Sequence, residues 1–594
     1  MAKLTPFGKI LIVGAAVGAL WGLKYFAYDK GLVFSKTTYK SQSVGSIDLP
    51  TAPPNAASTV PALPLPSAGT ASVSGSEVRF QVMAWNSQMG LMYANGGLTP
   101  TQGSLMAKNG VNLKLERQDD CNVMQQQLVK FAKEYAKDPS TKEGVHMVAV
   151  MGDGSAAFLA GLNKELEKIG PDYKAVVIGS CGFSYGEDKF MGLPSWRANP
   201  QSAKGALVST VIRDGDWNIV VKWAGDNNIP VNPDEKTYDP GAINFVNAPD
   251  YIAAANLYVA GKPETRDVVV NGVRTGEKKN ANINGVSTWT PGDVTVAEQK
   301  GGLVTIASTR EYAAQMPNTI ITISKWAKDN RQTVVNFLDA VSKGGDQVKC
   351  YSAALNYAGD ASARVYKEKE GAYWVRYYKG ETQPDKQGLN VELGGSKANN
   401  LADQLTLFGI APGSTNTFKI VYTTFGSIVS KLYPDLVPTY PAADSIMDLS
   451  YLQELASKTT TMASADTQSY NASAGITQKV SERAWSIEFK TGSAQLSPKA
   501  EFVLNEIANG AIVSSGLVLR IEGHTDNAGT PAGNQSLSEA RANAVKTWLQ
   551  AKYPNSFPNN RMSVMGKGQS EPVADNTSEV GRSRNRRVVI IMGK

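Results

Sequence analysis

Two charged side chains near the C-terminal end, Asp526 and Arg541, have the types and spacing needed to hold a small zwitterion. A carboxylate accepts hydrogen bonds from an ammonium group, and a planar guanidinium binds a carboxylate through two parallel hydrogen bonds. Backbone N–H groups at the start of a helix favour the same anionic end of a ligand. The alternative is that the two side chains form an ion pair with each other on the surface, since such pairs are common and weak.

The residues around this pair predict a strand, a loop and a helix in succession. Alternation of apolar residues favours a strand over residues 517–522, and the polar, glycine-rich stretch GHTDNAGTPAGNQ after it favours a loop. Ser536 as N-cap, with Glu539 three residues later, forms a capping box for the helix. Apolar residues recur at helical spacing, namely Leu537, Ala540, Ala544, Val545, Trp548 and Leu549. The loop and the helix start therefore place Asp526 and Arg541 at one mouth.

The motif GHTDNAG, together with Asn534 and LSEARA, resembles the signature of the OmpA-like peptidoglycan-binding domain. The flanks IEFKTGSAQLSPKA, GKGQSEPVADN and GRSRNRRVVI agree with it, and the resemblance covers about residues 480–594. It implies that the ligand is the diaminopimelate of the peptidoglycan stem peptide, held by Asp526 and Arg541. By the same match, the residues that line the site are Thr525, Asn527, Leu537 and Arg586.

Composition bounds the classes of function. A chain of 594 residues is too long for one core and should hold two or three domains. Its formal charge of +7 is spread along the chain, so nucleic-acid binding is not indicated. The only histidines are His146 and His524, and we predict no metal site and no cofactor. Cys121, Cys181 and Cys350 are either buried free thiols or include one bridged pair.

The N-terminal end predicts a membrane anchor followed by a linker. After a short tail (1–6), residues 7–28 contain the apolar run ILIVGAAVGALWGL and have about the length of a transmembrane helix. A cleaved signal peptide is the alternative, but no A-x-A cleavage site follows the run. Residues 29–77, rich in proline, alanine and serine, predict an extended linker.

Residues 78–455 predict a large α/β domain with two lobes, because about 375 residues exceed one core. Helices are expected at 121–137 and 155–169, and their alternation with strands implies mostly parallel sheets. The segments that read as strands are 78–85, 111–117, 146–154, 173–180, 217–224, 319–323 and 418–425.

This central region resembles the periplasmic substrate-binding proteins of ABC transporters, of the phosphate-binding type. The segments that carry the resemblance are VMAWNSQMG, GSCGFSYGEDKFMGLPSW and WNIVVKWAGDNNIPVN. The resemblance implies a small anionic solute between the lobes. Candidate ligand residues lie at strand ends or at a helix start, where open α/β sheets bind ligands, and they are Asn86, Ser87, Ser155, Ser180 and Ser184.

The loop MGDGSAA, with Ser155 as the helix N-cap, could bind an anion or could be a tight strand-to-helix turn. No arrangement of a nucleophile and a base is readable, so we predict no catalytic residue and no enzyme activity.

Residues 456–480 are small and polar and predict a second linker, which leads into a C-terminal domain at 481–594. In that domain a strand is expected at 485–489. A helix is expected over 497–513, with Ser497 as N-cap and Pro498 at its first position.

The predicted fold class is therefore multidomain α/β. It comprises an N-terminal transmembrane helix, a two-lobed periplasmic-binding-protein-like domain and a C-terminal OmpA-like α/β sandwich. The favoured function is an envelope protein anchored in the inner membrane of a Gram-negative-type cell, with its bulk in the periplasm, that binds peptidoglycan without catalysis. One alternative is a stator- or motor-type or envelope-assembly component whose central domain docks a protein partner. A stator would need an acidic residue in its span, and residues 7–28 have none. Another alternative is an enzyme acting on the wall.

Overall fold

The computed structural model describes residues 60–459, 469–490 and 492–594, and leaves the side chains of residues 509, 510, 512 and 513 undescribed. The predicted N-terminal tail, the transmembrane helix at 7–28 and most of the first linker lie outside the described residues. Within the described ranges, no helix combines the length and the apolar character that crossing a bilayer requires.

The first lobe of the central region is built on a six-stranded sheet in the order β16-β4-β13-β3-β1-β2. Strand β1 pairs parallel with β2 and β3, whereas β13 and β16 run antiparallel to their neighbours. The strands are β1 (Val78–Val82), β2 (Leu113–Arg117), β3 (Met147–Met151), β4 (Ala175–Ser184), β13 (Pro317–Ile323) and β16 (Ser396–Ala398).

The second lobe is built on a five-stranded sheet in the order β12-β5-β11-β6-β8. Its strands are β5 (Lys189–Gly192), β6 (Leu207–Thr210), β8 (Asn244–Asn247), β11 (Gly285–Thr288) and β12 (Val304–Ser308). Smaller sheets flank it, made of β7 (Thr237–Tyr238), β9 (Glu264–Val270) and β10 (Val273–Ala281), and of β14 (Glu381–Pro384) and β15 (Asn390–Leu393).

The chain crosses between the lobes more than twice, since β15 beside the second sheet leads into β16 of the first. Two of the crossings are residues 185–188 after β4 and residues 309–316 before β13. They are hydrogen-bonded to each other, because the Thr309 backbone N–H donates to the Asp188 carbonyl at 3.0 Å. The Thr309 hydroxyl also lies 2.7 Å from the Ser184 hydroxyl. One hydrophobic core includes residues of both lobes, so the lobes are packed together.

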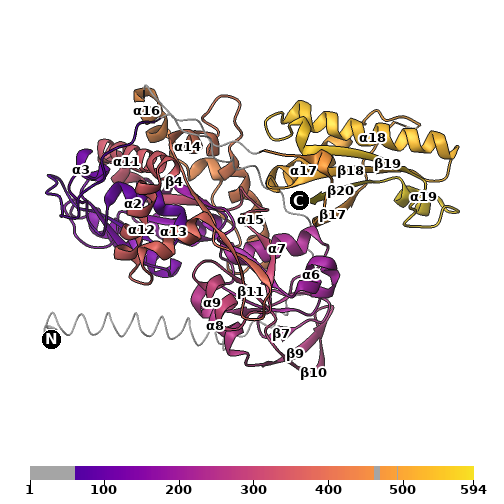
Figure 1. Ribbon diagram of the computed structural model, residues 1–594, viewed down its shortest axis with the longest axis horizontal. Coiled ribbons are helices and arrows are strands. Elements are labelled where there is room, and N and C mark those ends of the chain that lie inside the picture. The colour runs from indigo at the N-terminus through magenta and orange to yellow at the C-terminus, as the bar shows by residue number, and fades with distance from the viewer. Residues whose placement is uncertain (1–59, 460–468, 491) are drawn as a thin grey trace.

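Helices surround both sheets, and Figure 1 shows α8 and α9 on the second lobe with α2, α11 and α12 on the first. Helices α2 and α11 meet backbone to backbone, because a Cβ at Gly344 would lie 2.2 Å from the Gly90 carbonyl oxygen. The central helices are α2 (Met89–Asn95), α3 (Leu105–Lys108), α4 (Cys121–Tyr135), α5 (Ser155–Leu166), α6 (Pro194–Ala198), α7 (Gly215–Asp226), α8 (Tyr251–Ala260), α9 (Gly292–Gln299), α10 (Ser324–Asp329), α11 (Arg331–Cys350), α12 (Ser352–Tyr366), α13 (Gly371–Lys379), α14 (Leu401–Leu407), α15 (Thr417–Leu432) and α16 (Ser450–Lys458).

Two strand predictions are wrong, since residues 217–224 lie in α7 and residues 418–425 lie in α15. Every residue of α7 is buried, so its apolar run shows no helical stripe and resembles a buried strand. In α15 the period was readable, because the buried residues Phe418, Val421, Tyr422 and Phe425 follow helical spacing. The prediction of mostly parallel sheets is also wrong, because β5, β12, β13 and β16 pair antiparallel and make both sheets mixed.

The part of the first linker that is described lies against the central region. The Leu63 backbone N–H donates to Gln347 Oε1 at 2.9 Å, and Thr70 forms a bridge with Thr101. Residues 60–77 therefore have contacts that an isolated extended linker would lack.

The C-terminal domain has its own core and a four-stranded sheet in the order β17-β20-β18-β19. Strands β18 and β19 are parallel, and the other neighbours are antiparallel. Its elements are β17 (Lys479–Trp485), α17 (Ala500–Val513), β18 (Val518–His524), α18 (Pro531–Lys552), β19 (Met562–Gly568), α19 (Glu579–Asn585) and β20 (Val588–Gly593).

Three boundaries differ from the sequence prediction. The first strand covers Lys479–Trp485 and not 485–489, and α17 begins at Ala500 and not at Ser497. Helix α18 begins before Ser536, because the Thr530 side chain accepts from the Gly533 N–H and Pro531 occupies the first helical position. Thr530 and Pro531 therefore mark the start of α18.

The C-terminal domain contacts the segment that joins the two lobes (Figure 1). Lys594 forms an ion pair with Glu311, which is 4% exposed and lies in the 309–316 segment. Burial opposes ionisation of Glu311, but Lys594 and the Ser308 hydroxyl outweigh it and hold its pKa below the usual value.

We predict that Arg561→Ala destabilises the C-terminal domain strongly. The fully buried guanidinium donates to the carbonyls of Ala511, Ser514, Leu517 and Ser556. Leaving these carbonyls buried without a donor should cost about 3–5 kcal/mol. Hydrogen exchange of the β18 peptide in the full chain measures the loss. Lys552→Ala, which removes an exposed ion pair with Glu501, should leave exchange unchanged. Equal protection in both variants would contradict the prediction.

Candidate functional site

The loop between β18 and α18 is held in one shape by internal hydrogen bonds. The Thr525 N–H donates to the Gly568 carbonyl at 2.8 Å, and Asp526 Oδ1 accepts from the Ala528 N–H at 3.0 Å. Asn534 Nδ2 donates to the Asp526 carbonyl at 3.1 Å. A Cβ at Gly523 would lie 2.0 Å from the Ser538 carbonyl oxygen, so this glycine lets β18 and α18 approach closely. The loop residues are thereby fixed beside the first turns of α18.

Asp526 forms an ion pair, but its partner is Arg586 and not Arg541. The Arg586 Nη1–Asp526 Oδ2 distance is 2.6 Å, and Arg586 also contacts Glu579 at 2.6 Å. Hydrogen bonds from Arg586 to both carboxylates hold its pKa above the usual value. The alternative of a direct surface pair between Asp526 and Arg541 is therefore not what the structure contains.

Arg541 keeps a positive charge that no carboxylate of the described residues neutralises through an ion pair. Its Nε donates to the Ser493 carbonyl at 3.1 Å, and its guanidinium carbon lies 5.0 Å from the centroid of the Phe489 ring. Burial lowers its pKa, while the nearby charge of Asp526 raises it and that of Arg586 lowers it again. A largely buried guanidinium of this kind is suited to bind an incoming carboxylate.

The structure brings four of the six predicted wall-site residues together: Thr525, Asp526, Arg541 and Arg586. The Thr525 hydroxyl is buried and without a partner among the described residues. Asn527 is exposed and Leu537 is half-buried near the start of α18. Sequence reasoning missed Phe489 and Ser493, although the flank IEFKTGSAQ that contains them had been noted.

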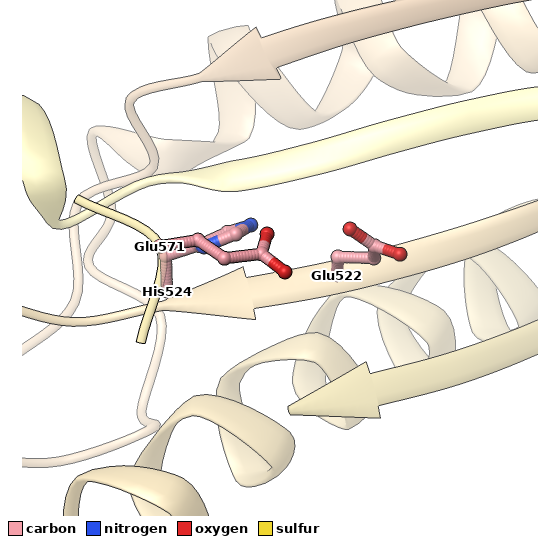
Figure 2. Close-up of side chains that lie close together, drawn as sticks. All are labelled: Glu522, His524 and Glu571. Atoms are coloured by element: carbon pink, nitrogen blue, oxygen red, sulfur yellow. The ribbon is translucent and has the colours of Figure 1, made fainter. Parts of the chain in front are cut away.

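One cluster in this domain has the composition of a metal site. Figure 2 shows the carboxylates of Glu522 and Glu571 facing each other beside His524, and their ligand atoms lie within 4.8 Å of one another. Cations already neutralise the acids, because Arg520 Nε lies 2.7 Å from Glu522 and Lys567 Nζ lies 2.9 Å from Glu571. These charges would repel a divalent ion, and we assign no metal here.

In the central region, four of the five predicted ligand residues use their hydroxyls within the fold. Ser87 Oγ accepts from Asn318 Nδ2 at 3.0 Å, and Ser155 Oγ donates to the Met151 carbonyl at 3.1 Å. Ser180 Oγ donates to the Gly182 carbonyl at 3.2 Å, and Ser184 Oγ pairs with Thr309. Ser155 is also not an N-cap, because α5 starts at it and Gly154 precedes it.

Asn86 differs from these serines, because its side chain is 1% exposed and both its amide atoms lack a hydrogen-bond partner among the described residues. Buried aspartates that the sequence did not single out lie in the same part of the molecule: Asp153, Asp188 and Asp216.

The comparisons with known proteins concern mainly the C-terminal domain. The family model described as "OmpA family" matches residues 488–586. Residues 488–586 thus form an OmpA family domain. The outer-membrane lipoprotein YfiB of Pseudomonas aeruginosa is 41% identical over 98 residues, which are 16% of this chain and 56% of that protein. The peptidoglycan-associated lipoprotein of Buchnera aphidicola is 36% identical over 105 residues, 18% of this chain and 59% of that protein. The chain thus spans little more than half the length of these two relatives.

The periplasmic nitrate-binding protein NrtA from Synechocystis PCC 6803 is a similar solved structure. It is 13% identical, covers 65% of this chain and 99% of its own, and has a TM-score of 0.37.

We predict that His524 stays neutral well below the usual pH for histidine. Burial, and secondarily Arg587, lowers its pKa to about 4. Because the unfolded chain takes up this proton near pH 6.5, the folded state loses stability as pH falls from about 6.5 to 4. NMR titration of imidazole protons in protein without a histidine tag measures the midpoint directly.

Burial also lowers the pKa of the other histidine, His146, to about 3. The variant His524→Gln retains only His146, so its spectrum shows which imidazole signals belong to which histidine. A midpoint between pH 6 and 7 for His524 would refute the prediction.

Proposed function

We propose that this protein binds peptidoglycan non-covalently through its OmpA family domain and recognises the diaminopimelate of the stem peptide. The observation that carries the proposal is the unneutralised guanidinium of Arg541 beside the loop carboxylate of Asp526. A relative whose name is peptidoglycan-associated lipoprotein supports it.

Recognition of a zwitterion follows from the charges of the site. The ligand carboxylate would pair with Arg541, while its ammonium group would hydrogen-bond to Asp526, which in the free protein is held by Arg586. Thr525, whose buried hydroxyl has no partner among the described residues, would supply a further polar contact. The ion pair with Arg586 orients the Asp526 carboxylate before the ligand arrives.

The central region, in this proposal, binds a small solute between its two lobes and performs no chemistry. Two mixed sheets joined by crossing segments support this, because such an arrangement allows hinge closure around a ligand. The protein would then carry a solute-binding module on the cell wall of a Gram-negative-type envelope.

We predict that the full-length protein co-sediments with diaminopimelate-type peptidoglycan and that Asp526→Asn and Arg541→Ala abolish this. Losing one partner of a charged recognition pair should cost about 2–5 kcal/mol, which is a loss of at least thirtyfold in affinity. Arg541→Lys should also bind weakly, because lysine keeps the charge but not the planar fork.

The matched control is Lys552→Ala, which removes a cation from the far end of α18. It should sediment like the unaltered protein. Lysine-type peptidoglycan, which lacks the second carboxylate of diaminopimelate, should bind less than the diaminopimelate type. Full binding by both site variants would overturn the proposal.

We further propose that residues 7–28 anchor the protein in the inner membrane, with the remaining residues in the periplasm. The protein should then begin near Met1 and resist extraction from membranes by high salt and carbonate. N-terminal sequencing that starts after residue 28, with the protein in the soluble fraction, would show a cleaved signal peptide. The wall-binding proposal is independent of that outcome.

A further inference from the structure

Four carboxylates come together where the two lobes meet, and we refer to Asp153, Asp188, Asp214 and Asp216 as the acidic cluster. Asp153 follows β3 in the first lobe, and Asp188 ends the first crossing segment. Asp214 caps α7 of the second lobe, and Asp216 lies in its first turn. The exposed fractions of Asp153, Asp188 and Asp216 are 1%, 0% and 0%.

The cluster is compact although its members are distant in sequence. A Cβ at Gly215 would lie 2.9 Å from Asp153 Oδ1, and one at Gly154 would lie 3.5 Å from Asp214 Oδ1. Burial, followed by the charges of Asp188, Asp214 and Asp153, raises the pKa of Asp216 well above its usual value. The carboxylates therefore face one another across the boundary between the lobes.

No lysine, arginine or histidine of residues 60–459, 469–490 or 492–594 forms an ion pair with these four carboxylates. The lysines next to the cluster in sequence are already engaged, Lys189 with Asp293 and Lys222 with Asp226. A buried group of like charges without a counter-ion is unfavourable, so the cluster lacks a positive charge.

The same region holds buried polar atoms with no hydrogen-bond partner among the described residues, which is rare in folded proteins. Both carboxylate oxygens of Asp216 and both amide atoms of Asn86 are of this kind. The others include Asp153 Oδ1, Asp188 Oδ1, Gln315 Oε1 and Asn318 Oδ1. Most of them are acceptors, so the missing partner is rich in hydrogen-bond donors.

The spacing of the carboxylates disfavours a single metal ion. In the described part of the chain, the residues whose three possible metal-ligand atoms lie within 4.8 Å of one another are Glu522, His524 and Glu571 of the C-terminal domain. The acidic cluster does not meet this condition. One aromatic side chain contacts the cluster, because Trp85 Nε1 donates to Asp188 Oδ2 at 3.0 Å. Carboxylates spread over such a distance suit an organic ammonium ion with several N–H donors, which is larger than a metal ion.

We propose that the acidic cluster binds a small organic amine in its positively charged form, held by N–H donors to Asp216, Asp188 and Asp153. This inference rests on the proposed solute-binding function and assigns the chemical class of the solute. It replaces the anion implied by the resemblance to phosphate-binding proteins, because four carboxylates would repel an anion.

The test measures thermal shift and calorimetric titration of the full-length protein at pH 8. The amine probes are putrescine, spermidine and agmatine, and the contrasting probes are choline, inorganic phosphate, nitrate, magnesium and zinc. At least one amine should raise the melting temperature, while choline, which carries no N–H donor, and the anions should not.

Asp216→Asn keeps the shape of the side chain and removes its charge. It should weaken amine binding at least tenfold, because the amide cannot provide the carboxylate that pairs with the cation, and it should not lower the melting temperature of the free protein, because burial and the neighbouring acids disfavour the Asp216 carboxylate. A purely structural Asp216 would give the opposite pair of results, a lower melting temperature and unchanged amine binding. The matched control is the exposed Asp172→Asn, which should change neither.

Amine affinity should also rise between pH 6 and 8.5. Burial raises the pKa of Asp153 to about 8 and that of Asp188 to about 7, so both lose protons in this range and attract a cation more strongly. The other charged groups around these two are Glu187, Lys189, Asp214, Asp216 and Asp293.

The outcomes separate this inference from the function on which it rests. A rise in the melting temperature with phosphate or nitrate, but with none of the amines, would overturn the inference and leave the proposal of solute binding intact. A shift with magnesium or zinc alone, or an equal response to choline, would overturn it as well. An unchanged melting temperature with every probe would overturn both the amine inference and the proposal of solute binding. Wall binding is tested separately by co-sedimentation.

Discussion

The structure depends most on which of its buried or half-buried charged side chains form ion pairs. Asp526 is paired with Arg586, so Arg541 forms no ion pair with a carboxylate in the described part of the chain, although the charge of Asp526 raises its pKa. The proposed wall site thus contains three charged side chains, and the positive charge of Arg541 has no ion-pair partner among the described residues. A direct Asp526–Arg541 pair would have closed the same site to a ligand carboxylate.

The acidic cluster also contains charged groups without ion-pair partners among the described residues, but here these groups are carboxylates. In the C-terminal domain, Arg520 and Lys567 neutralise Glu522 and Glu571, and the cluster around His524 is electrostatically complete. Between the lobes, Asp153, Asp188 and Asp216 form no ion pair with a cation of the described residues, and several hydrogen-bond acceptors without donors lie with them. Two groups of acids in one chain therefore differ in whether neighbouring lysine or arginine side chains form ion pairs with them.

The strand, loop and helix around Asp526 and Arg541 were largely predictable from the sequence, because a short motif contains them and the elements between the two residues are local. Arg586, the partner of Asp526, came from the resemblance, and the contacts of Arg541 with Phe489 and Ser493 needed the fold. The acidic cluster could not be predicted, since its members come from two lobes and join only after the chain has crossed between them. Helix α7 was misread for a related reason, because complete burial removes the polar face that reveals a helix.

The ion pair between Lys594 and Glu311 has a mechanical consequence. Glu311 belongs to a segment that joins the two lobes, and Lys594 follows the last strand of the domain proposed to bind the wall. Pulling the two apart would leave Glu311 buried without its cation, so separation is resisted electrostatically before any hydrophobic surface is exposed. In the proposed function, a pull on the C-terminal domain would thus act through this ion pair on the segment that joins the lobes.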